Sequence, residues 1–157
     1  MDYLVRTARI TDIDRVVALC ADILRIARTG SGARQLDAGD LLRQLVFLPQ
    51  ATVLVAETRR EIVGAAVLAL RPSVRAGGYV GTIDLLTVDP RHRVEEIADA
   101  LVEEALRSAA NKACVRVETT RPADAGEHDR WVRHGFATDG ELLVRPVERA
   151  RIGRQEA

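Results

Sequence analysis

The strongest constraint on the fold of this chain is a strand–helix–strand pattern between Tyr79 and Thr119. Tyr79–Val88 is a β-rich run that ends at Asp89-Pro90, and Cys114–Thr119 is a second β-rich run. Between them, apolar residues recur at the spacing of an amphipathic helix, namely Ile97, Leu101, Ala105, Leu106 and Ala109. The pattern therefore predicts two parallel strands joined by a right-handed crossover.

The rest of the chain supplies further strands and helices around this unit. In chain order the sequence predicts a strand over Val5–Ile10, a helix that starts at Thr11 or Asp12 and ends near Gly30, a helix over Asp37–Phe47, a hairpin of Thr52–Glu57 with Ile62–Leu70, a loop from Pro72 to Gly78, a short helix over Ala123–His134 and a last strand over Glu141–Val147. The hairpins imply antiparallel neighbours.

We therefore expect an α/β domain of the mixed α+β kind. It has a central mixed, mostly antiparallel sheet, one parallel β-α-β crossover and helices on both faces. A single domain should cover residues 1–147, followed by a charged tail over 148–157.

Composition narrows the classes of function. The 157 residues suit one domain, and Lys+Arg and Asp+Glu balance at 23 each, which argues against a nucleic-acid protein with a basic face. No apolar run is long enough to span a bilayer, and the first residues lack the pattern of a secretion signal. Cys20 and Cys114 lie far apart in apolar patterns, as expected for small buried thiols in a reducing compartment. We therefore expect a cytoplasmic protein that binds neither membranes nor nucleic acids.

Four short stretches of the sequence, in this order, resemble one known family. They are the segments Val5–Ile13, Thr52–Ala66, Ile83–Arg93 and Trp131–Phe136, of which the second contains the motif V-A-E … I-V-G. Together they resemble the GNAT superfamily of N-acetyltransferases over nearly the whole chain. The resemblance implies a domain that binds acetyl-CoA and passes its acetyl group to an amine of a small molecule or a protein. It also implies a possible homodimer, since homodimers are frequent in that family.

The same resemblance points to the residues that would bind acetyl-CoA. In the family, the backbone at the end of the cofactor strand pairs with the pantetheine arm, which implies Leu86, Thr87 and Val88. The strand Cys114–Thr119 would splay away to admit the thioester. The pyrophosphate would lie at the N-terminus of the next helix, where unpaired backbone N–H groups and the helix dipole favour anions. The family pattern Q/R-x-x-G-x-G/A falls on Arg93, Val94, Glu95, Glu96, Ile97 and Ala98.

This helix start departs from the family pattern at two positions. Arg93 and Ala98 fit the pattern, whereas Val94 and Glu96 stand where glycine is usual. A carboxylate about 4 Å from a phosphate charge costs about 4 kcal/mol at an effective dielectric constant near 20. Glu95 and Glu96 can instead stabilise the helix dipole by about 0.3–1 kcal/mol each. The segment is therefore open to two interpretations, a phosphate cradle or simply a stable helix start.

The candidate catalytic residues are Asp84 and His128. Asp84 matches the acidic position from which the family removes a proton from the attacking amine, directly or through water. The family's late tyrosine, which protonates the departing thiolate, is replaced by Trp131, whose indole N–H donates a hydrogen bond but does not titrate. His128 lies three residues before Trp131, on the same helix face, and is the nearest replacement acid.

Each of these residues also has an ordinary structural explanation. Asp84 would be a strand carboxylate facing solvent or an arginine, Trp131 a core residue and His128 an exposed helix histidine. No combination of histidines with acids has the spacing of a metal site, so no metal is expected.

Two functions therefore remain open. The first is an acetyl-CoA-dependent N-acyltransferase. The second is a domain of the same fold that has lost acetyl-CoA binding and acts as a regulatory or protein-interaction module. The resemblance as a whole favours the first. Glu96 and Trp131, two independent departures at two chemical positions, are the features that separate the two functions. The sequence does not identify the acceptor.

Overall fold

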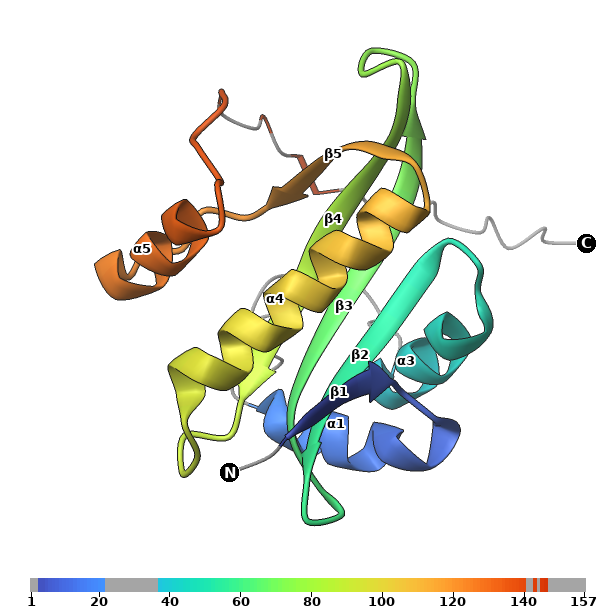
Figure 1. The fold of residues 1–157 in the computed structure, drawn as a ribbon. Helices are drawn as coiled ribbons and strands as arrows, with labels where there is room; N and C mark the ends of the chain where they lie inside the picture. Colours follow the sequence, from blue (N-terminus) through green and yellow to red (C-terminus); the bar gives the residue numbers. More distant parts are fainter. Residues whose placement is uncertain (1–2, 22–36, 141–142, 144, 147–157) are drawn as a thin grey trace, which may run out of the picture.

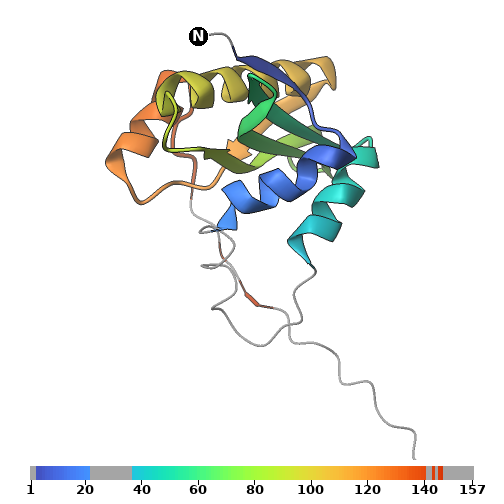
Figure 2. The same cartoon turned by 90° about the horizontal axis from the view of Figure 1, so that it is seen from below.

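The computed structural model describes residues 3–21, 37–140, 143, 145 and 146 of the chain. In this part, a five-stranded sheet in the order β1-β2-β3-β4-β5 separates helices on its two faces (Figures 1 and 2). The strands are β1 (Leu4–Thr7), β2 (Ala51–Thr58), β3 (Glu61–Ser73), β4 (Gly78–Val88) and β5 (Cys114–Thr119). The helices are the 3₁₀ turn η1 (Ile10–Asp12), α1 (Ile13–Leu19), α3 (Ala38–Phe47), α4 (Val94–Asn111) and α5 (Ala125–Arg133).

The strand pairing confirms the predicted topology. Strands β1 to β4 pair with their neighbours in antiparallel fashion, and β4 pairs with β5 in parallel, from Tyr79 opposite Cys114 to Ile83 opposite Thr119. Helix α4 makes the crossover between β4 and β5 and lies along one face of the sheet, whereas α1 and α3 cover the other face (Figure 2). The sheet is therefore mixed and mostly antiparallel, as the sequence predicts.

Strand β3 lies in the centre of the sheet and is buried on both sides. Val63 and Leu68 pack toward α4, whereas Ala65 and Val67 pack toward α1 and α3. A strand covered on both faces carries a nearly continuous apolar sequence, which explains the unbroken run in this segment.

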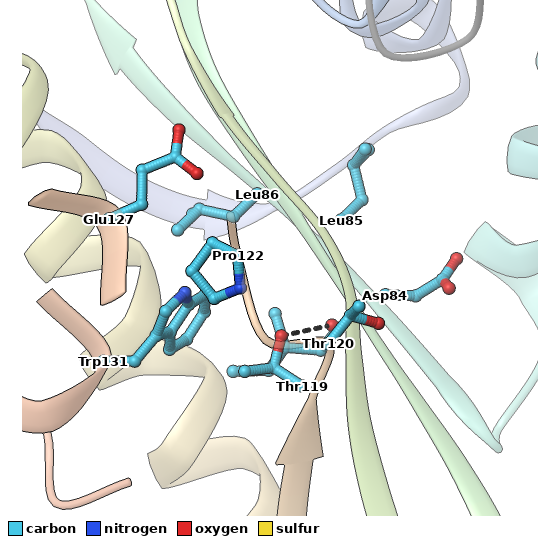
Figure 3. A pocket seen from close by; sticks show the side chains of 9 residues that line it. Asp84, Leu85, Leu86, Thr119, Thr120, Pro122, Glu127 and Trp131 are labelled. Carbon is cyan, nitrogen blue, oxygen red and sulfur yellow. Dashed lines mark hydrogen bonds between the residues drawn. The ribbon is translucent and has the colours of Figure 1, made fainter. Parts of the chain in front are cut away.

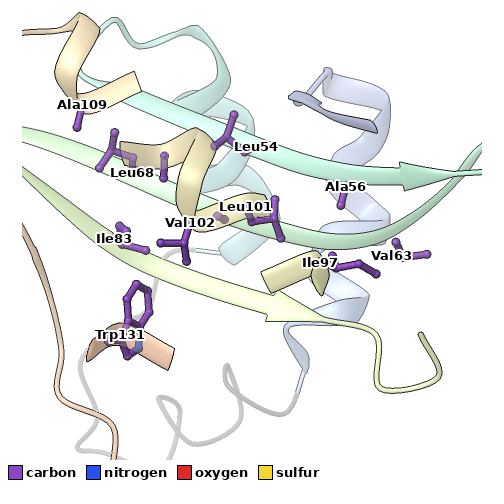
Figure 4. Packing of buried hydrophobic residues seen from close by; sticks show 12 residues of the cluster. Leu54, Ala56, Val63, Leu68, Ile83, Ile97, Leu101, Val102, Ala109 and Trp131 are labelled. Carbon is purple, nitrogen blue, oxygen red and sulfur yellow. The ribbon is translucent and has the colours of Figure 1, made fainter. Parts of the chain in front are cut away.

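Helix α4 packs on the sheet through the face that its apolar spacing predicts. Ile97, Leu101 and Ala105 are buried, and Leu101 is 0% exposed. They form one cluster with residues of β2, β3, β4 and α5 (Figure 4). A Cβ atom at Gly64 of β3 would lie 3.0 Å from Ile97 Cγ2 and 3.1 Å from Leu101 Cδ1, so glycine at this position lets the helix approach the strand closely.

The two cysteines are free thiols that belong to different sides of the sheet. Cys20 is buried in the cluster under α1 and α3, where burial raises the pKa of its thiol to about 11. Cys114 is half-buried against the cluster under α4. The expectation of a buried thiol is confirmed for Cys20, whereas Cys114 is only half-buried.

Two strand ends differ from the sequence-based prediction by three residues. β1 ends at Thr7 rather than at Ile10, because the Asp12 carboxylate accepts a hydrogen bond from the Arg9 backbone N–H at 2.7 Å and closes the turn η1. Strand β3 continues through Pro72 to Ser73, so the predicted loop from Pro72 to Gly78 shrinks to residues 74–77. A proline near a strand end costs little where its missing N–H has no ladder partner to lose.

Other predictions fall outside the described residues. They are the end of the first helix near Gly30, most of the last strand Glu141–Val147, and the tail over 148–157. Among the helices that are described, none combines the length and the apolar character needed to cross a membrane.

Candidate functional site

Strands β4 and β5 separate halfway along β4 and leave a fork between them. Their pairing ends at Ile83 and Thr119, where the Thr119 hydroxyl donates a hydrogen bond to the Ile83 carbonyl at 3.1 Å. Strand β4 continues to Val88, whereas β5 stops and the chain turns away toward α5 (Figure 1). Among the described residues, the edge of β4 from Asp84 to Val88 therefore has no strand beside it on the β5 side. This divergence matches the splay that the family resemblance implies.

A pocket of about 190 Å³ lies at this fork (Figure 3). Leu86, Pro122 and Trp131 give it an apolar wall, and the acidic residues Asp84 and Glu127 also line it. The complete lining is Ile83, Asp84, Leu85, Leu86, Thr119, Thr120, Pro122, Glu127 and Trp131. The two arms of the fork and helix α5 thus enclose one space.

A β-bulge decides where Asp84 points. The register of β3 with β4 shifts so that Leu68 lies opposite Ile83 and Val67 lies opposite Leu85, which leaves Asp84 as the extra residue. Asp84 is exposed, and its carboxylate points away from Trp131 and Glu127 in Figure 3. The carboxylate therefore meets solvent across β4 from the pocket wall that α5 forms.

Helix α5 faces the pocket with Glu127 and Trp131, which are four residues apart and share a helix face. Trp131 is only 8% exposed and packs edge-to-face on Phe136 with ring centroids 5.1 Å apart, so it belongs to the core as well as to the pocket. His128 is half-buried and is not one of the residues that line this pocket. Sequence reasoning missed Glu127, although its spacing from Trp131 was a usable signal.

The turn between β4 and α4 is fixed by the buried carboxylate of Asp89. It accepts hydrogen bonds from the Arg91 backbone N–H at 3.0 Å and from the Arg91 guanidinium at 2.8 Å, and it pairs with Arg15 of α1 at 3.2 Å. The Arg91 side chain and backbone hold the pKa of Asp89 far below its usual range. The turn before α4 is thus tied to α1 on the other face of the sheet.

The first turn of α4 carries backbone N–H groups that no side chain caps. Arg93 is the N-cap residue and makes no side-chain cap hydrogen bond, and the first backbone bond of the helix runs from the Ile97 N–H to the Arg93 carbonyl at 3.1 Å. In the described part of the chain, no hydrogen bond engages the N–H groups of Val94, Glu95 and Glu96. Three such groups at the positive end of a helix suit an anion.

The two carboxylates of this first turn are both engaged elsewhere. Glu95 accepts two hydrogen bonds from Arg130, at 2.7 and 3.1 Å, and one from Arg133 at 3.2 Å. The Arg130 guanidinium lowers the pKa of Glu95 to about 2. Glu96 accepts from the Tyr3 hydroxyl and lies 3.4 Å from the Arg93 guanidinium. Because neither carboxylate caps the helix, the N–H groups stay open to an anion despite the two missing glycines.

The remaining residues that the sequence predicts to bind acetyl-CoA lie in β4 and in the first turns of α4. The Leu86 side chain lines the pocket, the Thr87 hydroxyl donates to the Leu19 carbonyl at 3.1 Å, and Val88 packs against the cluster under α4. Ile97 and Ala98 are buried beneath the first turn of α4. Of the three predicted residues of β4, Leu86 is the one that lines the pocket.

One group of possible metal ligands comes together away from the pocket. Oxygen and nitrogen atoms of Glu61, Asp89 and His92 lie within 4.8 Å of one another, which their sequence spacing did not indicate. Arg15 and Arg91 already form ion pairs with both carboxylates, at 2.8–3.2 Å for Asp89 and 3.6–3.8 Å for Glu61. We interpret the group as an ion-pair network that anchors the turn before α4.

Comparison with known proteins identifies the family. The sequence model of the acetyltransferase (GNAT) family matches residues 18–136. No curated protein sequence matches the chain.

Several solved structures share the fold. A transcriptional regulator from Bacillus halodurans C-125 superposes with a TM-score of 0.76 at 20% identity, covering 93% of this chain and 100% of the other. An acetyltransferase from Trypanosoma brucei gives a TM-score of 0.69 at 20% identity, covering 93% and 100%. A ribosomal-protein-alanine N-acetyltransferase from Brucella melitensis biovar Abortus 2308 gives 0.68 at 16% identity, covering 92% and 99%. At these identities the similarity shows the fold alone.

Proposed function

Because the chain belongs to the acetyltransferase (GNAT) family, we propose that it transfers the acetyl group of acetyl-CoA to an amine of a small molecule or a protein. The observation that carries the proposal is the fork between β4 and β5, with a pocket of about 190 Å³ on one side and an uncapped helix start at its end. An elongated thioester with an anionic tail suits a site that combines a free strand edge, a pocket and an uncapped helix start.

The chain's own groups would hold the donor in two ways. The backbone of Leu86, Thr87 and Val88 would pair with the amide groups of the pantetheine arm, since this edge of β4 is free of a strand. The backbone N–H groups of Val94–Glu96, together with Arg93, would receive the phosphates. When bound, acetyl-CoA supplies a thioester carbonyl that an amine can attack.

Asp84 would remove the proton from the attacking amine. A lysine-like amine has a pKa near 10.4 and is not nucleophilic while protonated. The Asp84 carboxylate is exposed at the bulge of β4 and can accept this proton directly or through water.

The opposite wall, formed by α5, would act on the departing thiolate of coenzyme A. The Trp131 indole N–H can donate a hydrogen bond but no proton. His128 would protonate the thiolate only through water, because it does not line the pocket. Leu86, Pro122 and Trp131 would exclude water from the thioester.

The test is release of free thiol from acetyl-CoA with a panel of amines, such as polyamines, amino acids, amino sugars and peptides with free N-termini. Asp84→Asn should lower kcat by about 10²–10⁴ and leave the KM for acetyl-CoA nearly unchanged. Asp129→Asn, an exposed aspartate of α5, is the matched control and should leave kcat unchanged. Equal turnover by Asp84→Asn and the wild type would remove Asp84 from the mechanism.

The competing proposal is a non-catalytic module of the same fold. It depends on the repulsion expected from Glu96 and on the missing tyrosine at Trp131. The contacts of Glu96 with Tyr3 and Arg93 weaken the first of these arguments. Acetylation of no amine in the panel, combined with absent acetyl-CoA binding, would favour this alternative.

A further inference from the structure

The acidic residues at the start of α4 are held by different partners on different elements. Glu95 is fixed by Arg130 and Arg133 of α5. Glu96 is contacted by the hydroxyl of Tyr3, which precedes β1 and lies 93 residues earlier in the chain. Each contact supplies a hydrogen-bond donor to one of these carboxylates. Without these contacts, the carboxylates would lie beside the open N–H groups of the helix.

Without Tyr3, Glu96 would have only Arg93 as a partner among the described residues. The two side chains are three residues apart on the helix, lie 3.4 Å from each other and are more than half exposed. This ion pair is present alongside the contact with Tyr3 and is too exposed to hold the carboxylate in one place. Without the Tyr3 hydroxyl, the Glu96 carboxylate could also rotate toward the N–H groups of Val94–Glu96 and interact with the helix dipole itself.

Tyr3 is well placed to prevent this. Its ring packs against the cluster under α4, so the hydroxyl is presented to Glu96 by a half-buried and restrained side chain. The hydrogen bond to Glu96 raises the pKa of Tyr3 and lowers that of Glu96. At neutral pH the phenol therefore stays protonated and donates, and the carboxylate stays ionised and accepts.

We propose that Tyr3 is a positioning residue for the diphosphate of the acyl donor. Its hydroxyl holds the Glu96 carboxylate aside, and this keeps the N–H groups of Val94–Glu96 available to the phosphates. The inference rests on the proposed function, and it explains how a helix start with Glu in place of Gly can still receive an anion.

The test is a double-mutant cycle read by calorimetric titration with coenzyme A. Tyr3→Phe should weaken coenzyme A binding about tenfold, because it removes only the hydroxyl and leaves the ring packed. In the Glu96→Gln background the same change should have no effect, because no carboxylate charge remains to be held aside. The loss caused by Tyr3→Phe should shrink as salt rises from 50 to 500 mM, since ions screen the repulsion. Tyr79→Phe, which changes the second of the two tyrosines, is the matched control and should bind like the wild type.

Dephospho-coenzyme A separates the diphosphate from the 3′-phosphate. It keeps the diphosphate, so Tyr3→Phe should weaken its binding by the same factor. A loss confined to coenzyme A would mean that Glu96 faces the 3′-phosphate, and would overturn the proposal.

Three other results would also overturn it. The first is an unchanged Kd in Tyr3→Phe. The second is an equal loss in the Glu96→Gln background, which would show that Tyr3 acts through packing. Either of these leaves the proposed function intact. Absence of coenzyme A binding by the wild type at millimolar ligand would instead refute the proposed donor together with this inference.

Discussion

Replacing Leu101 by alanine should lower the stability of the domain by about 3 kcal/mol, within the range of about 2–5 kcal/mol for buried leucines. The structure favours a large loss because Leu101 is 0% exposed and lies in the middle of the cluster under α4. Its Cδ1 atom would lie 3.1 Å from a Cβ at Gly64, so the strand beneath it is already at close distance. Glycine has no side chain that could move to fill the cavity left by the missing atoms.

Urea unfolding followed by circular dichroism measures this loss. With a slope of about 1.5–2 kcal/mol per molar urea, a change of about 3 kcal/mol moves the midpoint by about 1.5–2 M. The matched control is Glu103→Ala on the exposed face of the same helix, which should stay within about 0.5 kcal/mol of the wild type. A loss below about 1 kcal/mol for Leu101→Ala, or a loss equal to that of Glu103→Ala, would refute the assignment of this helix face to the core.

Three further predictions follow from single contacts. Gly64→Ala should cost about 1–3 kcal/mol in a thermal melt, because its Cβ would lie 3.0 Å from Ile97 and 3.2 Å from the Thr87 backbone carbonyl; an unchanged Tm would contradict the close packing. Pairing with Arg130 depresses the pKa of Glu95 from 4.5 to about 2, so its stabilising effect is complete above pH 4.5 and is lost as the pH falls toward 2. Fluorescence of Trp131, the single tryptophan, should report this acid transition of α5. Glu95→Gln should lower the stability measured at pH 7 and should remove the loss of stability that protonation of Glu95 causes between pH 4.5 and 2. Val94→Gly with Glu96→Gly should lower Tm by a few degrees, since each glycine costs about 1 kcal/mol in a helix, and should tighten coenzyme A binding less than tenfold, because Tyr3 and Arg93 already engage Glu96.

The architecture could be predicted because it depends on patterns that are local in sequence. The apolar spacing from Ile97 to Ala109 determines which face of α4 is buried, and a helix between two strands determines that they are parallel. The turn at Arg59 and Arg60, both with positive φ, likewise joins two β-rich runs that pair as a hairpin. In these cases the local pattern and the tertiary structure agree.

The details of the site depend on contacts that no local pattern records. The bulge that makes Asp84 the extra residue arises from the register of β3 against β4, which the strand sequences do not specify. The contact of Tyr3 with Glu96 joins residues that are 93 positions apart. Sequence reasoning could assign Glu96 a charge and a position on the helix, but not the direction in which its side chain points. Its effect on a nearby phosphate depends on that direction.

The most direct test of the central claim is a calorimetric titration of the wild-type chain with acetyl-CoA at 150 mM salt. The fork between β4 and β5 and the uncapped start of α4 predict one site per chain with a Kd between about 1 μM and 1 mM, the range in which KM values commonly lie. Ala98→Glu would place a further carboxylate at a buried position of the first turns of α4, and it should abolish this binding if the protein remains folded by circular dichroism. Heat of binding that saturates at one equivalent would support acetyl-CoA as the donor. No binding by the folded wild type at millimolar acetyl-CoA would contradict it.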